Sequence, residues 1–228
     1  MNAGGFNDDH ELCCKKVKKW YSVGAMEHLV KLLNFVKLIN DFKNIERDIP
    51  QSVGFKREND IEHSYQLAMV SWYLATVSDH HLDINKILKY ALVHDLPEIY
   101  AGDTPLYTAD EEQLYSKKDR EIKAILKLNE TFSDFKDLHI WTKKYEEKVD
   151  NESKFVYAVD KLLPILSIYL DNGYAWKTHK IDLESLIHKN KDRVAISPIV
   201  EKYFNLIIEA IQKILIYPMK IQQFSRKH

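Results

Sequence analysis

The sequence is poor in cysteine, glycine and proline. Its 228 residues include two cysteines, six glycines and six prolines. Cys13 and Cys14 are neighbours, which rarely bridge each other, so the chain has no disulfide framework and suits a reducing cytoplasm. Because turn residues are scarce and few stretches alternate apolar with polar residues, the composition argues against a sheet protein and favours helices.

The sequence also lacks an excess of charge of one sign and a long hydrophobic run. Its 33 basic and 34 acidic side chains give a formal net charge of −1, which does not favour a polyanionic partner such as nucleic acid. No apolar stretch approaches the roughly eighteen residues of a membrane span. The N-terminus lacks the basic start and apolar stretch of a secretory signal. We therefore expect a soluble cytoplasmic protein with no nucleic-acid or membrane partner.

What the sequence does contain is a succession of helical periods, with 45% hydrophobic residues, enough for one buried core. We expect an all-α fold, a single-domain multi-helix bundle. Residues 1–25 form an N-terminal extension and the start of the first helix, residues 26–217 the bundle, and residues 218–228 a C-terminal tail. The expected helices lie near residues 27–44, 60–78, 84–95, 110–128, 133–149, 153–170, 183–192 and 198–216, and residues 46–59 are expected to be a loop.

Three of these helices each carry an ionisable side chain on a face that is otherwise apolar. His63 begins the apolar line of the second helix, Asp95 continues that of the third, and Asp160 lies within FVYAVDKLLPIL. A buried, unpaired carboxylate is costly, so each aspartate should be neutralised, paired or bound to a cation. The pattern predicts that something positive faces these side chains.

The third helix ends in further ionisable residues. His94 precedes Asp95, and Pro97 can end the helix just beyond them. Imidazole and carboxylate are common ligands of divalent transition ions, and two histidines with two aspartates leave room on an ion for water or substrate. Glu98 follows His94 at i+4 and Asp95 at i+3, which is a suitable position for a general acid or base beside the ion.

The order His63, His94–Asp95, Asp160 resembles the H…HD…D signature of the HD-domain metal-dependent phosphohydrolases. The stretch from RENDIEHS through HDLPEIYAGD to VDKLL is similar in particular to their 5′-deoxynucleotidase branch, over about residues 30–170. In that branch a glutamate and then Gly-Asp follow the HD pair.

The resemblance implies roles for individual residues. His63, His94, Asp95 and Asp160 would bind the metal. Glu98 would handle protons and orient the attacking water. Asp103, in the Gly-Asp pair, would support the water, the leaving 5′ oxygen or the sugar.

The phosphate-gripping residue implied by the resemblance is an arginine in the loop before the first histidine. Arg47 and Arg57 both fit, and spacing does not decide between them. If Arg47 is the match, Asp48 stands where the bacterial deoxynucleotidases have a tryptophan that helps to exclude the ribose 2′-hydroxyl. Lys161, next to Asp160, is interpreted as a surface residue.

Taken together, these implications describe a phosphomonoesterase that hydrolyses nucleoside or deoxynucleoside 5′-monophosphates to nucleoside and phosphate. It would use one divalent ion, which the ligand types leave open among Co, Mn, Fe, Ni, Zn and Mg, and would act as a homodimer. Two alternatives stay open: an HD-type triphosphohydrolase that releases triphosphate from nucleoside triphosphates, and a non-catalytic metal- or nucleotide-binding module.

Overall fold

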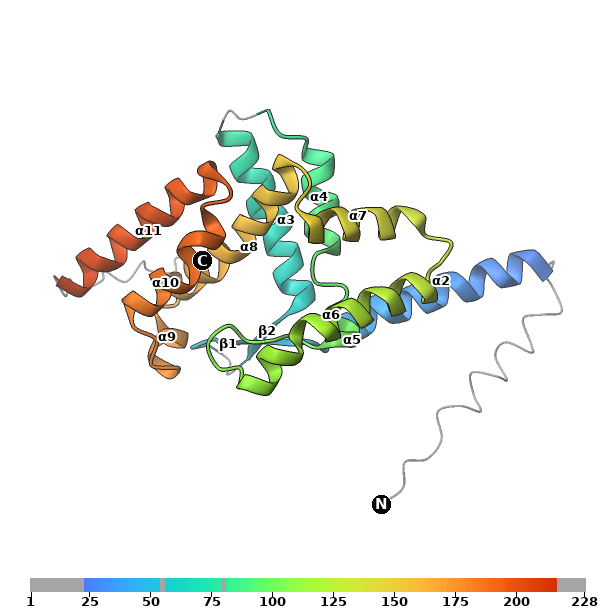
Figure 1. Cartoon of the computed structure of the whole chain (residues 1–228), viewed down its shortest axis with the longest axis horizontal. Coiled ribbons are helices and arrows are strands. Elements are labelled where there is room, and N and C mark those ends of the chain that lie inside the picture. The colour runs from blue at the N-terminus through green and yellow to red at the C-terminus, as the bar shows by residue number, and fades with distance from the viewer. Residues whose placement is uncertain (1–22, 54–55, 79–80, 217–228) are drawn as a thin grey trace, which may run out of the picture. The chain divides into compact units, whose positions relative to one another are not determined.

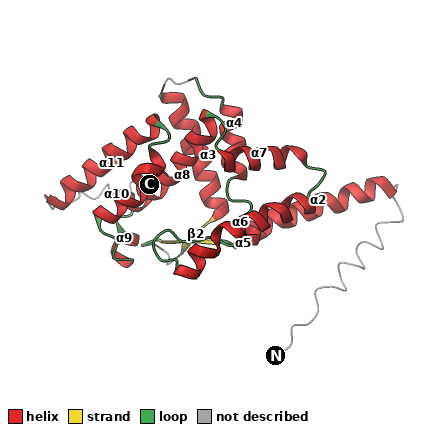
Figure 2. Cartoon of the chain, viewed as in Figure 1, coloured by secondary structure: helices red, strands yellow, loops and turns green. Residues whose placement is uncertain are grey.

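The structure is a computed structural model that describes residues 23–53, 56–78 and 81–216. Nearly all regular secondary structure in these ranges is helical (Figure 2), so the expected all-α fold is confirmed. Contacts divide the chain into one unit of residues 1–41 and a second of residues 42–228. Most of the predicted N-terminal extension and the predicted tail lie outside the described residues.

The described part of the first unit is helix α2 (Val23–Phe42), whose last residue already belongs to the second unit. The helix begins at Val23, four residues before Glu27, the residue at which the spacing of apolar residues predicted its start. The predicted domain boundaries at residues 25 and 217 stay a prediction.

The second unit contains every other helix that the sequence predicted, and two short helices, α5 and α9, that it did not. Within the described ranges no helix combines the length and apolar character that a membrane crossing requires. The elements are β1 (Glu46–Pro50), β2 (Arg57–Asn59), α3 (Asp60–Val77), α4 (Ile84–Val93), α5 (Glu98–Ala101), α6 (Glu111–Thr131), α7 (Lys136–Glu147), α8 (Asn151–Leu170), α9 (Tyr174–Thr178), α10 (Leu183–Val194) and α11 (Pro198–Ile216).

The segment predicted as a loop, residues 46–59, instead forms a hairpin. β1 pairs antiparallel with β2, with Glu46 opposite Asn59 and Pro50 opposite Arg57. Pro50 is tolerated because it stands at the end of a strand in a two-stranded sheet, where one missing amide donor leaves no neighbouring strand unpaired. β2 ends at Asn59 and α3 begins at the next residue. The residues of the hairpin are therefore held at a fixed position relative to the start of α3.

Helix α8 is the centre of the second unit (Figure 1) and contacts α3, α4, α7, α9, α10 and α11. Each large apolar side chain that it buries contributes about 1.5–3 kcal/mol to folding relative to an exposed one. The polar residues of α8 therefore lie among tightly packed neighbouring helices. Fully buried residues of this core include Leu67, Ile87, Phe155, Val156, Leu162, Val194 and Phe204.

Two capping boxes fix the starts of α3 and α8, two of the three helices that carry the site. Asn59 accepts a hydrogen bond from the Glu62 amide, and the Glu62 side chain accepts one from the Asn59 amide, so α3 begins at Asp60. Asp150 and Ser153 form the same arrangement at the start of α8. Because both starts are defined, the register of every later side chain on these helices is defined too.

Candidate metal centre and active site

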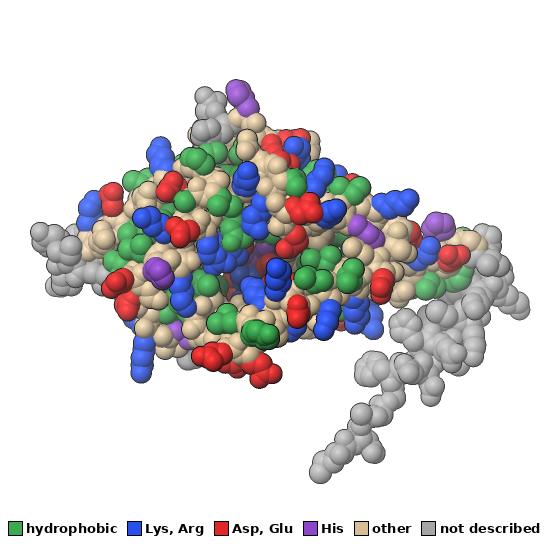
Figure 3. Space-filling model, viewed as in Figure 1, with side chains coloured by type: hydrophobic (Ala, Val, Ile, Leu, Met, Phe, Trp, Pro, Cys, Tyr) green, Lys and Arg blue, Asp and Glu red, His purple; other side chains and the backbone are tan. Residues whose placement is uncertain are grey.

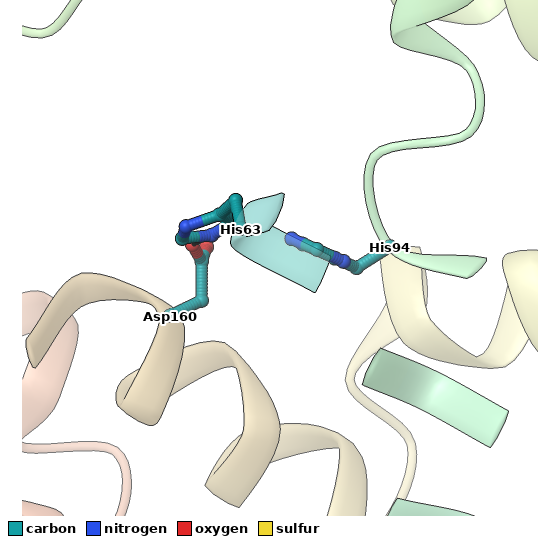
Figure 4. A group of neighbouring side chains, drawn as sticks. All are labelled: His63, His94 and Asp160. Atoms are coloured by element: carbon teal, nitrogen blue, oxygen red, sulfur yellow. Dashed lines mark hydrogen bonds and ion pairs between the residues drawn. The ribbon is translucent and has the colours of Figure 1, made fainter. Parts of the chain in front are cut away.

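Three side chains from three helices meet in the interior of the second unit. His63 comes from α3, His94 from the end of α4, and Asp160 from α8, and all three are buried. His63 Nε2 lies 2.9 Å from Asp160 Oδ1 (Figure 4). The centroids of the two imidazole rings are 5.3 Å apart, and one possible ligand atom from each residue lies within 4.8 Å of the others. The site thus brings together the ligand types of a divalent ion.

The fourth predicted ligand, Asp95, lies beside His94 in an arrangement that needs a cation. His94 Nδ1 is 2.9 Å from the Ala91 carbonyl oxygen, to which it donates a hydrogen bond, so Nε2 is the nitrogen that faces the centre. His94 Nε2 lies 2.8 Å from Asp95 Oδ2, and this nitrogen is buried without a hydrogen-bond partner. Two electron-pair donors at this distance repel unless a proton or a metal ion lies near both. The donor set therefore fits a divalent transition ion.

A second group of carboxylates adjoins the first. One oxygen from each of Asp60, Asp95 and Glu98 lies within 4.8 Å of the others. Asp60 is fully buried, and Asp60 Oδ2 and Glu98 Oε2 have no hydrogen-bond partner. The sequence interpretation missed Asp60, although it precedes His63 at i+3 and so shares its helix face. The centre therefore contains two carboxylates, those of Asp60 and Glu98, in addition to the four predicted ligands of one ion.

Arg47 on β1 supplies the positive charge that faces these carboxylates. Its Nη1 lies 2.7 Å from Asp95 Oδ2 and 3.4 Å from Asp60 Oδ1, and its side chain is only 14% exposed. The other candidate, Arg57, is 51% exposed and contacts Asp48 at 3.4 Å. The structure therefore brings Arg47 into the centre and leaves Arg57 on the outer side of the hairpin.

The carboxylates differ strongly in how readily they ionise. Burial and the neighbouring charges of Asp95 and Asp103 raise the pKa of Glu98 well above its usual value. Burial and Asp95 also raise the pKa of Asp60 to about 7. For Asp160, burial is outweighed by the charge of Lys161 and a hydrogen bond to His63, which hold its pKa well below the usual range. Glu98 is thus the residue suited to hold a proton beside ionised ligands.

His63 is oriented by a second carboxylate. Its Nδ1 faces Glu58 Oε2 on β2 at 3.6 Å, while Nε2 faces Asp160. Burial and the charge of Arg47 oppose protonation, but the hydrogen bond to Asp160 and the nearby carboxylate of Glu58 outweigh them and raise the pKa of His63 to about 9. A carboxylate behind a ligating histidine is a common way to fix the ring and increase its basicity.

Asp103 reaches the site through a turn that needs glycine. Gly102 ends α5 with φ 74° and ψ 151°, a backbone conformation that side-chain-bearing residues rarely adopt. Arg120 on α6 holds the following residues, since it donates to the Ala101 carbonyl and, at 2.8 Å, to Thr104 Oγ1. Asp103 therefore projects from a braced loop, and burial raises its pKa.

A cavity of about 150 Å³ opens onto this centre. Its walls include Arg47, Asp95, Glu98, Asp103 and Asp160, all predicted from sequence. Figure 3 shows a hollow on this face with lysine and arginine side chains at its rim. Lys161, interpreted as a surface residue, is only 21% exposed, lines the cavity and lies 2.5 Å from Asp160 Oδ2. Its adjacency to a candidate ligand was the sequence signal for this position.

The fold and the centre together define a helical bundle with a buried histidine–aspartate metal site. The HD domain family matches the chain over residues 39–200. The chain belongs to the HD-domain family, in its 5′-deoxynucleotidase-like branch, and the resemblance inferred from the sequence is confirmed.

Individual relatives agree with this placement. The chain is 30% identical over 139 residues to bovine "5′-deoxynucleotidase HDDC2", a match that covers 59% of this chain and 65% of that protein. It is also 30% identical over 166 residues to the Dictyostelium discoideum protein of the same name, covering 66% of this chain and 80% of that one. A crystal structure titled as a "Predicted metal-dependent phosphohydrolase" from Magnetospirillum magnetotacticum is 28% identical with a TM-score of 0.69, covering 81% and 93% of the two chains.

Proposed function

We propose that the protein is a metal-dependent phosphomonoesterase that hydrolyses nucleoside or deoxynucleoside 5′-monophosphates to nucleoside and phosphate. The observation that carries the proposal is the convergence of His63, His94, Asp95 and Asp160 beside Arg47, with Asp95, Asp160 and Arg47 lining one cavity. The names of the bovine and Dictyostelium relatives support the nucleotide as substrate.

The proposed metal ligands are His63, His94, Asp95 and Asp160, and we propose one divalent ion among Co, Mn, Fe, Ni, Zn and Mg. A bound ion of this kind lowers the pKa of water and polarises a phosphoryl oxygen. In the reaction the oxygen of water forms a bond to phosphorus, and the bond from phosphorus to the 5′ oxygen breaks. The 5′ oxygen leaves with the electron pair and takes up a proton.

The remaining residues position and neutralise the reacting groups. Arg47 would balance the negative charge that develops on the phosphoryl oxygens, for which a planar guanidinium is well shaped. Glu98 would accept or return the proton, because its carboxyl group is buried beside the ligands with a raised pKa. Asp103, on the same cavity wall, would hold the attacking water, the 5′ oxygen or the sugar.

A substrate panel tests this proposal directly. The purified protein is incubated with Mn²⁺ or Co²⁺ and each ribo- and deoxynucleoside 5′-monophosphate or 5′-triphosphate, and the products are separated by chromatography. Release of phosphate from monophosphates is expected. Triphosphate as the product would instead identify the triphosphohydrolase alternative, and no hydrolysis of any compound would favour the non-catalytic module.

We also propose that the protein forms a homodimer, through the outer face of α3. Between His63 and Val77 this helix has no charged residue, and an uncharged, apolar surface helix is typical of a covered one. The exposed side chains offer on the order of 500 Å² per copy, so pairing two copies would bury about 1,000 Å², enough for a specific interface. The residues of this face are Tyr65, Met69, Trp72, Tyr73 and Val77, which are 67%, 44%, 48%, 65% and 51% exposed.

Light scattering after size-exclusion chromatography tests the dimer. Trp72→Glu should convert it to a monomer, because a charge buried at an apolar interface is unfavourable. Tyr115→Glu is the matched control, since Tyr115 is 92% exposed and lies on a different helix, α6. A monomeric wild-type protein would contradict the proposal. A cytoplasmic location is proposed on the composition alone, since Cys13 and Cys14 suit a reducing compartment.

A further inference from the structure

Three cationic side chains surround one tyrosine beside the metal centre. Tyr157 lies on α8, one turn before Asp160. Lys148 Nζ is 4.4 Å and Lys161 Nζ 5.1 Å from the centroid of its ring, and Arg193 Nε is 3.4 Å from its hydroxyl oxygen. These four residues are called the Tyr157 cluster below.

The cluster is assembled from three helices. Lys161 shares α8 with the tyrosine, and Arg193 lies on α10. Lys148 caps the C-terminus of α7 in the left-handed conformation, with φ 49°. Glycine is the usual residue in that conformation because a side chain there is strained. A lysine at this position places its ammonium group over the tyrosine ring, which glycine would not do.

The positive charge of the cluster is balanced only in part, by Asp160 beside Lys161 and by the charge of Glu146, which acts on Lys148 and Lys161. Among the described residues, Asp160 is the only carboxylate within 4 Å of any of the three cations, and it contacts Lys161. Burial would raise the pKa of the Tyr157 hydroxyl, but the hydrogen bond from Arg193 and the charges of Lys161 and Lys148 hold it below its ordinary value. Three like charges around one ring repel each other, and a bound anion would relieve that repulsion.

Two of the four residues of the cluster lie in the wall of the same cavity as the reaction centre. Lys161 and Arg193 line the cavity together with Arg47, Asp95 and Asp160. Lys161 belongs to both regions, because its Nζ lies 2.5 Å from Asp160 Oδ2. One part of the cavity wall therefore carries the carboxylates and Arg47. An adjoining part carries Lys161, which pairs with Asp160, and Arg193, which has no carboxylate within 4 Å among the described residues.

We propose that the Tyr157 cluster binds a second phosphoryl group of the substrate, so that nucleotides with two phosphoryl groups are hydrolysed in preference to monophosphates. This inference rests on the proposed phosphatase function. Arginine and lysine recognise phosphate through charge-assisted hydrogen bonds. The second group is attached either at the sugar 3′ position, as in a nucleoside 3′,5′-bisphosphate, or directly to the first, as in a nucleoside 5′-diphosphate.

In both substrates a phosphoryl group is transferred to water, from the 5′ ester oxygen of the bisphosphate or from the bridging anhydride oxygen of the diphosphate. Water supplies the oxygen that bonds to the departing phosphorus, and one bond from that phosphorus to a bridging or 5′ oxygen breaks. The oxygen left on the product keeps the electron pair and takes up a proton. The phosphoryl group held by the Tyr157 cluster stays on the product, so the cluster affects binding and orientation without taking part in bond breaking.

Comparison of three adenosine substrates tests the inference. We would measure kcat/KM with Mn²⁺ for adenosine 3′,5′-bisphosphate, adenosine 5′-diphosphate and adenosine 5′-monophosphate. The wild-type protein should prefer one of the first two over the monophosphate by about tenfold. Arg193→Gln and Lys148→Gln should each lower that preference by about fivefold, because each removes one charged partner. Whichever substrate is preferred identifies where the second phosphoryl group is attached.

Lys189→Gln is the matched control. Lys189 also lies on α10, but it contacts the Leu106 carbonyl and the Tyr107 ring, outside the cluster. It should keep the wild-type preference, and so should Arg193→Lys, which retains the charge. Calorimetric titration of the metal-free proteins with adenosine 3′,5′-bisphosphate adds a readout independent of turnover, with weaker binding expected for the two cluster variants.

The possible failures are distinguishable. Hydrolysis of monophosphates with equal kcat/KM for all three compounds would overturn the second phosphoryl site and leave the proposed function intact. A preference that Arg193→Gln and Lys148→Gln leave unchanged would also overturn it. Absence of phosphate release from every nucleotide would overturn the proposed function itself.

Discussion

Two groups of polar side chains adjoin α8, and they differ in whether their atoms are satisfied. The first, the cap cluster, consists of Lys86, Tyr90, Asp150, Glu152 and Ser153. Asp150 accepts hydrogen bonds from the Tyr90 hydroxyl at 2.9 Å and from the Ser153 amide at 2.8 Å. Lys86 lies 3.3 Å from Asp150 and 3.4 Å from Glu152. No side-chain atom of this cluster is among the buried atoms that lack a partner.

The metal centre is the opposite case. His63 Nδ1, His94 Nε2, Asp60 Oδ2 and Glu98 Oε2 are all buried without a hydrogen-bond partner. An unsatisfied buried polar atom costs about 1–3 kcal/mol, so such a group persists where a ligand or a reaction needs it. The comparison teaches that satisfied polar clusters hold the fold together, whereas the unsatisfied one marks the site of binding and chemistry.

The largest effect expected is the loss of activity when a metal ligand is removed. Asp95→Ala should abolish metal binding and lower kcat/KM by about 1,000-fold or more, because the ion carries the activation of water. Glu98→Gln should keep the ion and lower kcat by about 100-fold to 10,000-fold, the range for a lost general acid or base. Metal content by mass spectrometry and phosphate release distinguish the two variants. Equal loss of metal in both would show that Glu98 is a ligand.

The two arginines of the hairpin provide a matched pair with the next largest effect. Arg47→Ala should lower kcat/KM by about 100-fold, the usual effect of removing one donor to developing charge. Arg57→Ala should change it by less than about threefold, as is usual for an exposed ion pair, since Arg57 is 51% exposed and contacts only Asp48 among the described carboxylates. Steady-state kinetics with the preferred substrate check both values, and similar losses in the two variants would show that the centre extends across the hairpin.

Much of the fold and part of this contrast could be predicted from the sequence. The helices followed from local spacing of apolar residues, and His63, Asp95 and Asp160 stood out because a charged group on an apolar face needs an explanation. The hairpin was wrongly predicted as a loop because its pairing joins short strands that show no alternation of apolar and polar residues. The choice between Arg47 and Arg57 depended on that pairing, so sequence spacing alone left it open.

The Tyr157 cluster shows where sequence reasoning ends. Lys148, Tyr157 and Arg193 belong to three helices, and none of them stands out in composition or spacing. Lys148 takes the left-handed conformation at a helix end without the glycine that would signal it. Only the packing of α7 and α10 against α8 brings these charges together, and tertiary packing is not encoded in any local pattern.

A moderate effect on stability is expected in the cap cluster. Asp150→Ala should lower the free energy of unfolding by about 2 kcal/mol, since it removes a helix cap and leaves the Tyr90 hydroxyl unpaired. Burial opposes ionisation of Asp150, but its hydrogen bonds from Ser153, Tyr90 and Lys86 lower its pKa. The stabilisation should therefore be complete above the unfolded pKa of about 4 and be lost as the pH falls further.

Urea unfolding of wild type and Asp150→Ala from pH 7 to pH 3 measures this difference. Asp137→Ala is the control, because Asp137 is 56% exposed and pairs with Lys89 at the surface. It should change the free energy of unfolding by less than about 0.5 kcal/mol. A difference between wild type and Asp150→Ala that persists undiminished at pH 3 would show that the carboxylate charge is not what stabilises the cap.

The smallest effect expected has the opposite sign and lies in the metal centre. Asp60 is fully buried, Asp60 Oδ2 has no partner, and the nearby carboxylates of Asp95 and Glu98 repel its charge. Asp60→Asn keeps the shape of the side chain and removes that charge, so the metal-free protein should become more stable by about 1 kcal/mol, as is common where function has been favoured over stability. Thermal unfolding in the presence of a chelator measures the change. A destabilised Asp60→Asn protein would show that the contact with Arg47, at 3.4 Å, outweighs the repulsion, and that Asp60 then belongs with the satisfied polar groups of the fold.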